Sequence, residues 1–258
     1  MRIVVKVGTS TLAYPTGLSN LRRISVLCRV LSDFKNAGHE VILVSSGAIG
    51  MGVGKLSLDG RPQDIPGKQA AAAVGQCELM YTYDKEFSKY HHTVAQILLT
   101  GSEVEQPEHF QNFINTMERL LAWKALPIVN ENDTVATKEI AIGDNDTLAA
   151  IVATSVHADL LVLLSDIDGL YTANPRTNPD AKRIAEVWEL TPGILSLADG
   201  AGSSMGTGGM ATKLYAAGLC MEAGCDMIIA NGGSPEILYS LLDGIPFGTR
   251  FYGKKEEK

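Results

Sequence analysis

The sequence contains little that would place the chain in a membrane or carry it across one. Only three apolar residues, 3–5, precede Lys6, which is too few for the apolar core of a signal peptide. The most apolar run, residues 160–164, lies between Asp159 and Asp166 and is far too short to span a bilayer. We therefore expect no membrane partner and a cytoplasmic location.

Positive charge is also scarce. The chain has 258 residues, with 22 Lys and Arg against 29 Asp and Glu, which gives a formal net charge of −7. A nucleic-acid surface needs a clustered positive field, so this balance argues against a nucleic-acid partner. A small anionic ligand held by a few lysines remains compatible with it.

Cysteine is rare and lacks a pairing pattern. Cys28, Cys77, Cys220 and Cys225 show no C-x-x-C spacing. Without a secretory context such residues are expected to be free thiols in a reducing cytosol, and the pair Cys220 and Cys225 does not by itself make a zinc site. We therefore assign no residue of the chain as a metal ligand.

The glycine-rich stretch of residues 47–54 lacks both common nucleotide-binding motifs. No G-x-G-x-x-G can be placed there, and Gly54 and Lys55 are followed by Leu56, so the stretch is not a Walker A loop. Ser46 and Gly47 can instead offer backbone amides to an anionic group. A glycine that only allows close helix packing is an equally good interpretation of Gly47.

Carboxylates and amides gather between residues 128 and 148. Residues 130–133, Asn-Glu-Asn-Asp, follow a short apolar run and should stand at the end of a buried parallel strand, where open α/β sheets bind their ligands. Asp144 precedes a helical pattern as a candidate N-cap, so Asn145 and Asp146 should lie at a helix start. Both clusters could face one crevice. Two ordinary turns rich in Asn and Asp are the alternative.

Two lysines stand near glycines at the ends of predicted elements. Lys6 lies at the end of a first strand, just before Gly8, and Lys213 opens a helix behind Gly208 and Gly209. Helix N-termini preceded by glycines bind phosphate through free N–H groups and the helix dipole. The alternatives are a lysine that extends from a strand edge into solvent and a flexible loop with an incidental lysine.

Strand and helix patterns alternate along the chain. Apolar runs predict strands at residues 2–7, 41–44, 94–99, 126–129, 160–164, 227–230 and 248–252, and helical patterns follow at 21–34, 68–87, 103–123, 148–152 and 211–223. Residues 57–66 and 172–180 read as loops, and the charged tail 254–258 as solvated. This alternation predicts an α/β fold with a mainly parallel sheet. Trp123 is expected to pack on the sheet or on a second subunit.

Five stretches resemble motifs of the amino acid kinase family: Lys6-Val7-Gly8-Thr9-Ser10, Ser45-Ser46-Gly47-Ala48, Asn130-Glu131-Asn132-Asp133, Gly143-Asp144-Asn145-Asp146 and Thr207-Gly208-Gly209-Met210-Ala211-Thr212-Lys213. The resemblance covers essentially the whole chain. It implies a single domain, 1–258, with a three-layer αβα sandwich around a mainly parallel sheet. Residues 1–150 would hold the amino acid and residues 151–253 would hold ATP.

Within that family the motifs are similar to members that phosphorylate the γ-carboxylate of L-glutamate to L-glutamyl 5-phosphate, the first step of proline biosynthesis. The resemblance implies that Lys6 and Lys213 contact the ATP phosphates and that Asp146 orients them. It implies that Ser46, Asp133 and Asn145 bind glutamate. The implied ATP-binding positions are Lys6, Gly8, Ser165, Asp166, Thr207, Gly208, Gly209, Met210, Ala211, Thr212 and Lys213.

The resemblance further implies that ATP carries Mg²⁺, that free proline acts as a feedback inhibitor and that the chain forms a homo-oligomer. Many members of this branch carry a further C-terminal domain similar to RNA-binding modules, and this sequence stops near Tyr252 without it. Aspartate-specific members tend to open with Lys-x-Gly-Gly-Thr-Ser, whereas here one glycine, Gly8, precedes Thr9. Two alternatives remain open: a sister kinase acting on aspartate, carbamate or a nucleotide, and a non-catalytic ligand sensor on the same fold.

Overall fold

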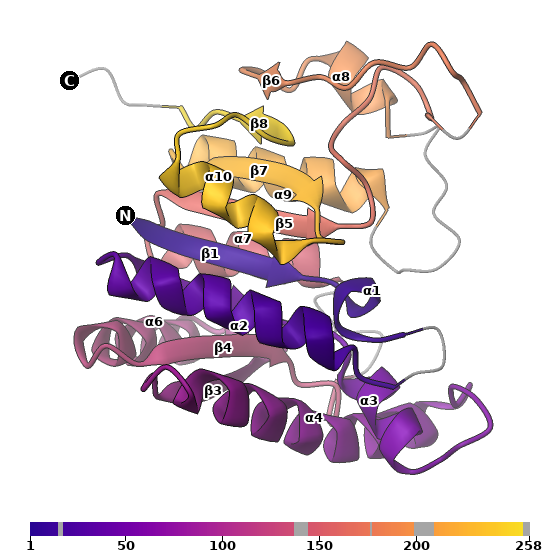
Figure 1. Cartoon of the computed structure of the whole chain (residues 1–258), viewed down its shortest axis with the longest axis vertical. Helices are drawn as coiled ribbons and strands as arrows, with labels where there is room; N and C mark the ends of the chain where they lie inside the picture. The colour runs from indigo at the N-terminus through magenta and orange to yellow at the C-terminus, as the bar shows by residue number, and fades with distance from the viewer. Residues whose placement is uncertain (15–17, 137–143, 176, 199–208, 255–258) are drawn as a thin grey trace.

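The fold is taken from a computed structural model, which describes residues 1–14, 18–136, 144–175, 177–198 and 209–254. Its strands form one sheet in the order β3-β4-β2-β1-β5-β7-β8-β6, within the described residues. All paired strands are parallel except β7 and β8 (Figure 1). The predicted α/β class with a mainly parallel sheet is therefore confirmed. The strands are β1 (Arg2–Val7), β2 (Glu40–Val44), β3 (Val94–Leu99), β4 (Leu126–Glu131), β5 (Leu160–Ser165), β6 (Glu186–Val187), β7 (Asp226–Asn231) and β8 (Thr249–Phe251).

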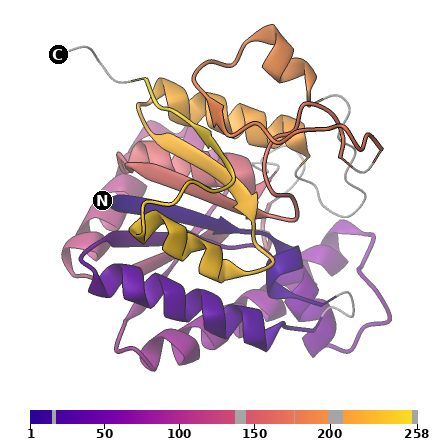
Figure 2. The same ribbon diagram turned by 45° about the horizontal axis from the view of Figure 1, so that its top comes forward.

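Helices cover both faces of the sheet and complete the expected three layers. The residues of α2, α4 and η1 pack on one face, and those of α6, α7 and α9 pack on the other (Figures 1 and 2). The helices are α1 (Thr9–Leu12), α2 (Leu21–Asn36), α3 (Ala48–Lys55), α4 (Ile65–Ser88), α5 (Gly101–Glu105), α6 (Pro107–Ala122), α7 (Asn145–Ser155), α8 (Pro192–Ser196), α9 (Met210–Glu222), η1 (Pro235–Leu238) and α10 (Tyr239–Leu242).

The alternation along β1 divides the core between the two faces. Ile3, Val5 and Val7 pack toward α2, whereas Val4 belongs to the core that contains α7 and α9. Because side chains alternate across a strand, Lys6 lies on the same face as Val4. The central strand therefore directs its one lysine toward α7 and α9.

The carboxyl ends of the central strands form the edge at which a ligand site is expected. β1 pairs with β2 on one side and with β5 on the other, and the strand order reverses there. Open α/β sheets bind ligands outside the carboxyl ends of the strands at such a switch point. In Figure 1 the arrowheads of these strands point toward α1 and α3.

Two predicted helices differ from the observed ones, and the helix α3 was not predicted. The glycine-rich residues after Gly47 form the helix α3, and α4 starts earlier than predicted because Asp64 caps it by accepting a hydrogen bond from the Gly67 N–H. The predicted helix 103–123 is two helices, α5 and α6, which part at Gln106 before Pro107, a residue suited to the first turn of a helix. Trp123 is 70% exposed, so packing on the sheet is ruled out for it.

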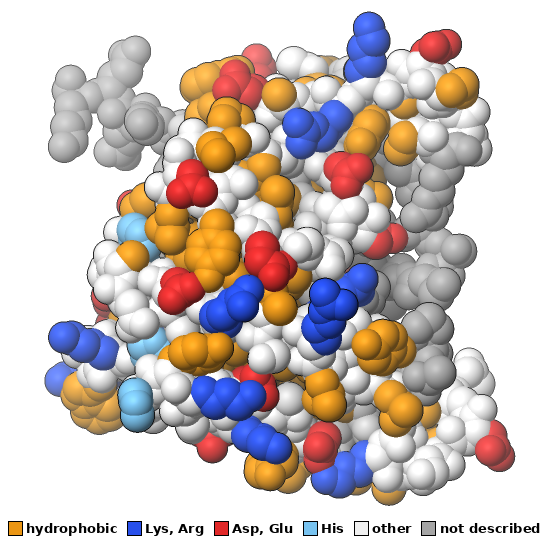
Figure 3. Space-filling view, in the orientation of Figure 1, with side chains coloured by type: hydrophobic (Ala, Val, Ile, Leu, Met, Phe, Trp, Pro, Cys, Tyr) orange, Lys and Arg blue, Asp and Glu red, His pale blue; other side chains and the backbone are white. Residues whose placement is uncertain are grey.

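Three features relate to the surroundings expected for this chain: its surface charge, its helices and its cysteines. On the face drawn in Figure 3, basic and acidic side chains are interspersed among apolar ones. Among the described residues, no helix is both long enough and apolar enough to cross a membrane. Cys28, Cys220 and Cys225 are buried free thiols, and Cys77 is an exposed one.

Candidate active site

Three ionisable side chains from distant parts of the chain meet at the carboxyl edge of the sheet. Lys6 Nζ lies 2.6 Å from Asp146 Oδ1, and Lys213 Nζ lies 2.9 Å from Asp146 Oδ2. The side chain of Asp146 is 1% exposed, and both lysines are mostly buried. We call these three residues the charged cluster.

Local sequence places each member of the charged cluster. Lys6 comes from the central strand β1. Asp146 lies in the first turn of α7, whose N-cap Asp144 accepts hydrogen bonds from two backbone N–H groups at 2.8 and 2.9 Å, as its sequence position predicts. Lys213 lies in the first turn of α9, which begins after Gly209. Both helix starts add the positive end of a helix dipole to the cluster.

The electrostatics of the cluster favour a further anion. Burial raises the pKa of Asp146, but the adjacent charges of Lys6 and Lys213 outweigh it, so this pKa lies below its usual value. Asp146 is therefore ionised at neutral pH. Two lysines and one aspartate leave a net positive charge in a largely buried place. Such a charge is stabilised when an anionic ligand approaches.

Neutral polar groups surround Asn145, the residue before Asp146. Asn145 Nδ2 lies 2.7 Å from the Ser45 carbonyl oxygen, 2.7 Å from Ser46 Oγ and 3.0 Å from Asn130 Oδ1. Asn130 Nδ2 in turn donates to Gln76 Oε1 at 2.9 Å. We call Ser46, Asn145, Asn130 and Gln76 the amide network. It brings together β2, β4, α4 and α7, as expected for two polar clusters that share one crevice.

Two buried members of this region have no counterpart among the residues singled out in the sequence. Gln76 is 7% exposed, and Tyr83, which is fully buried on the same helix, lies 2.9 Å from Ser45 Oγ through its hydroxyl. Both stand in the long helix α4, where small and apolar residues hide them in the sequence. A glutamine on the buried face of a helix was the available signal, because buried polar groups need partners.

Asp133 lies apart from the charged cluster, on the loop after β4. Burial raises its pKa, and the nearby charge of Arg61 opposes that rise. The loop approaches the start of α4, since Gln69 Nε2 donates to the Ala136 carbonyl oxygen at 3.3 Å. Asp133 thus offers a partly desolvated carboxylate on the side of the amide network.

The expected nucleotide-side residues lie around the ends of β1 and β5 and the start of α9. Gly8 precedes α1, and Ser165 ends β5, where its hydroxyl donates to Asp166 Oδ1 at 3.2 Å. Gly209 is the N-cap of α9, and Thr212 Oγ1 donates to its carbonyl oxygen at 2.8 Å. Met210 and Ala211 form the first turn of the same helix. Thr207 and Gly208 lie outside the described residues.

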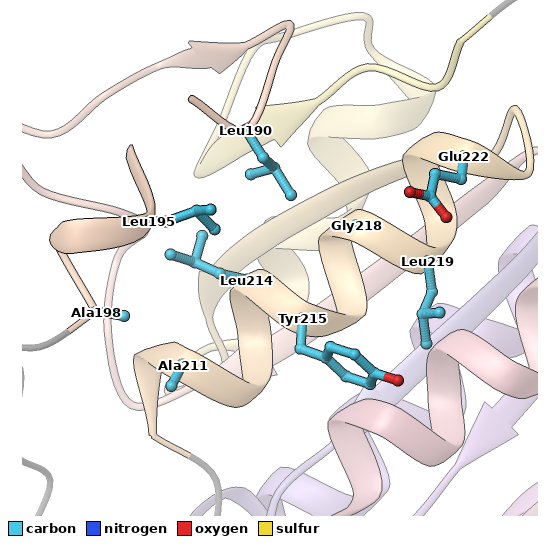
Figure 4. A pocket seen from close by; sticks show the side chains of 9 residues that line it. All are labelled: Leu190, Leu195, Ala198, Ala211, Leu214, Tyr215, Gly218, Leu219 and Glu222. Atoms are coloured by element: carbon cyan, nitrogen blue, oxygen red, sulfur yellow. The ribbon is translucent and has the colours of Figure 1, made fainter. Parts of the chain in front are cut away.

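A pocket of about 420 Å³ lies along α9, beside α8 (Figure 4). Of the expected site residues that the structure describes, only Ala211 lines it. Its other walls are mainly leucine side chains, with Tyr215 and Glu222 as the polar exceptions. The described lining includes no lysine or arginine to hold a phosphate group, so we place the reacting groups at the charged cluster rather than here.

Comparison with known proteins finds closely similar sequences. The chain is 56% identical to the glutamate 5-kinase of Clostridium perfringens (strain 13 / Type A) over 260 aligned residues, covering 99% of this chain and 97% of that protein. It is 54% identical to the glutamate 5-kinase of Listeria monocytogenes serovar 1/2a (strain ATCC BAA-679 / EGD-e), covering 99% of this chain and 94% of that protein.

Solved structures share the fold at much lower identity. The carbamate kinase from Giardia lamblia bound to AMP-PNP superposes with a TM-score of 0.69 at 16% identity, covering 98% of both chains. The model of the amino acid kinase family matches residues 1–231. With this match over most of its length, and with relatives at more than half identity, the chain belongs to the amino acid kinase family.

Proposed function

We propose that this chain transfers the γ-phosphoryl group of ATP to the γ-carboxylate of L-glutamate and forms L-glutamyl 5-phosphate. The observation that carries the proposal is the charged cluster of Lys6, Asp146 and Lys213, which offers net positive charge beside the neutral amide network. The two relatives described above are both glutamate 5-kinases. A sister activity on aspartate, carbamate or a nucleotide is therefore not favoured.

The chemistry requires charge neutralisation more than proton transfer. The γ-carboxylate of glutamate is ionised at pH 7, so it attacks the γ-phosphorus of ATP without a general base. The bond between that phosphorus and the β–γ bridging oxygen breaks, and ADP leaves. Two anions must be held together while negative charge shifts onto the leaving oxygen. Positioned cations are the usual means of stabilising such a transition state.

We assign the neutralising role to Lys6 and Lys213 and the orienting role to Asp146. One carboxylate touching both ammonium groups fixes the distance between them before the substrates arrive. In this proposal Asp133 binds the α-ammonium of glutamate, and Ser46 and Asn145 hold its polar ends. Residues 1–150 then form the glutamate side and residues 151–253 the ATP side.

The nucleotide is proposed to lie at the ends of β1 and β5 and against the start of α9. Gly8, Ser165, Asp166 and residues 207–213 are the proposed contacts. Among the described residues, no group of three or more His, Cys, Asp or Glu side chains could hold a metal ion. Mg²⁺ prefers oxygen ligands and keeps several waters, so we propose that it enters on the ATP phosphates, where it would neutralise part of their charge.

The direct test is ATP turnover by the purified chain in the presence of glutamate. Hydroxylamine converts an acyl phosphate to a hydroxamate, so a hydroxamate that depends on both ATP and glutamate is the expected product. Aspartate, carbamate and a nucleoside monophosphate serve as competing acceptors. Turnover with one of these and none with glutamate would contradict the proposal.

Three further properties belong to the proposal. We place the reaction in the cytoplasm and expect a homo-oligomer, which sedimentation of the purified chain measures. Free proline, which has the ammonium and α-carboxylate of glutamate but no γ-carboxylate, is expected to compete at or near the Ser46 and Asp133 site. Initial rates at several glutamate and proline concentrations test this. Rates unaffected by proline at low glutamate would exclude the inhibition.

A further inference from the structure

Gln76 occupies a place in α4 that two glycines fix tightly. A Cβ on Gly75 would lie 1.7 Å from the Ala48 carbonyl oxygen, and a Cβ on Gly52 would lie 1.8 Å from the Ala71 carbonyl oxygen. The helices α3 and α4 therefore touch backbone to backbone, directly after the Ser46 turn. A side chain next to such a contact has little freedom to shift.

The hydrogen bonds of the amide network are donated in one direction, from Asn145 to Asn130 and from Asn130 to Gln76. Gln76 Oε1 accepts from Asn130 Nδ2, so the oxygen of the Asn130 amide faces the other way. That oxygen accepts from the Glu131 N–H at 2.9 Å and from Asn145 Nδ2 at 3.0 Å. If the Asn130 amide turned over, its NH₂ group would face that of Asn145, and donors cannot pair with each other. The Glu131 N–H can only donate, so it fixes the Asn130 oxygen on its side and directs the Asn130 NH₂ group at Gln76, whose oxygen is the acceptor that holds this group in place.

The same direction continues to the proposed substrate groups. Asn145 Nδ2 faces Ser46 Oγ at 2.7 Å, so the Ser46 oxygen serves as acceptor and its own proton stays available to an anionic ligand. The Asn145 carbonyl oxygen points away from its NH₂ group and can accept from an ammonium. Both properties disappear if the Asn145 amide turns over.

We propose that Gln76 is a positioning residue for the acceptor substrate, acting through Asn130 to hold Asn145 and Ser46 in the orientation that recognises an amino acid zwitterion. The inference rests on the proposed function. Gln76 touches neither substrate in this scheme, and its effect is confined to the acceptor side. Loss of its acceptor oxygen leaves a buried donor on Asn130 without its partner, a change that typically alters an equilibrium by about tenfold.

The test uses three variants of the full chain. Gln76→Met keeps length and removes the amide, Gln76→Glu keeps an acceptor oxygen, and Leu79→Met changes packing one turn further along the same helix. We expect Gln76→Met to raise the KM for glutamate roughly tenfold, with the KM for ATP unchanged and kcat moving much less. Gln76→Glu should lie closer to the wild type than Gln76→Met does, and Leu79→Met should match the wild type.

If Gln76 served packing alone, Gln76→Met should lie closer to the wild type than Gln76→Glu does, because a buried methionine is tolerated better than a buried carboxyl group. That ranking, or an unchanged glutamate KM in Gln76→Met, would overturn the inference while leaving the proposed function standing. Calorimetric titration of the wild-type chain with glutamate distinguishes failure of the inference about Gln76 from failure of the proposed function. A wild-type chain that neither binds nor phosphorylates glutamate would overturn both the inference and the proposed function. If Gln76→Met does not fold, Gln76→Ser, which is too short to reach Asn130, carries the same expectation.

Discussion

Two neighbouring regions of the site solve different physical problems with different chemistry. The charged cluster joins Lys6 and Lys213 through one buried carboxylate, and its contacts are ion pairs of 2.6 and 2.9 Å. The amide network uses uncharged groups linked by hydrogen bonds of 2.7–3.0 Å. The regions meet at the start of α7, where Asn145 belongs to one and Asp146 to the other.

The difference follows from what each region must recognise. Charge that shifts during phosphoryl transfer is stabilised by fixed charges placed close to it. An amino acid zwitterion has an ammonium and a carboxylate close together, so it is distinguished by the direction of donors and acceptors. Amides supply direction without the high desolvation cost of buried charges. Damage to the charged cluster should therefore slow the reaction, and damage on the acceptor side should weaken glutamate binding.

The largest expected effect concerns Asp133, the charged residue of the acceptor side. Asp133→Ala removes the proposed partner of the substrate ammonium, an interaction present in both the ground state and the transition state, so it should chiefly raise the KM for glutamate. A desolvated contact of this kind is worth about 2–5 kcal/mol, or about 30-fold to several thousand-fold in kcat/KM. Steady-state kinetics, with circular dichroism to check folding, measures it. If Asp133→Ala lowered only kcat, the roles assigned to the charged cluster and to the acceptor side would have to be exchanged.

The next effect in size is that of Lys213 in the charged cluster. Lys213→Ala removes one of two positive charges next to the transferring phosphoryl group and should lower kcat by roughly 100-fold or more. Lys89→Ala is the matched control, since this lysine is half-exposed and pairs with Glu86 on α4. An unchanged kcat in Lys213→Ala would remove this residue from the mechanism.

A smaller loss is expected from Asp146, which acts through the lysines. Asp146→Asn keeps the shape of the side chain but removes the charge that holds both ammonium groups, so kcat should fall by about tenfold while the KM for glutamate moves little.

The same variant, Asp146→Asn, should lose less stability in acid than the wild type does. Because the folded pKa of Asp146 is lowered, its stabilising contribution is present above the unfolded value and is lost as the pH falls through the folded pKa. A rise in the glutamate KM alone would contradict this assignment.

The charged cluster and the amide network also differ in how far the sequence predicted them. Lys6 could be singled out because it stands at the end of an apolar strand pattern, and Asp146 and Lys213 because each stands at the start of a helical one. Both positions are expected at the carboxyl edge of a parallel sheet. The pairing of these three residues required the fold. The roles assigned to them stay predictions.

Gln76 and Tyr83 could not be found in the same way. Their partners Asn130 and Ser45 are 54 and 38 residues away in the sequence, and no local pattern records a contact of that length. The helix α3 was missed for a related reason. Glycine weakens a helix in isolation, but here Gly52 is the residue that lets α4 approach, so tertiary packing outweighs local propensity.

The smallest expected effect sets stability against function at Asp133. Burial holds its pKa above the ordinary value, so the ionised carboxylate destabilises the free protein. The sign of the pH dependence follows: the penalty is absent below the unfolded pKa and grows as the pH rises through the folded one. Asp133→Asn, which cannot ionise, should therefore raise Tm at pH 7–8 by no more than about 2 °C and should lose that advantage toward pH 4. Thermal unfolding of both proteins across this range measures the difference. If the rise in Tm of Asp133→Asn over the wild type were largest in acid, Asp133 would be stabilised as a carboxylate in the free protein. The acceptor side would then rely on a preformed ion pair, as the charged cluster does.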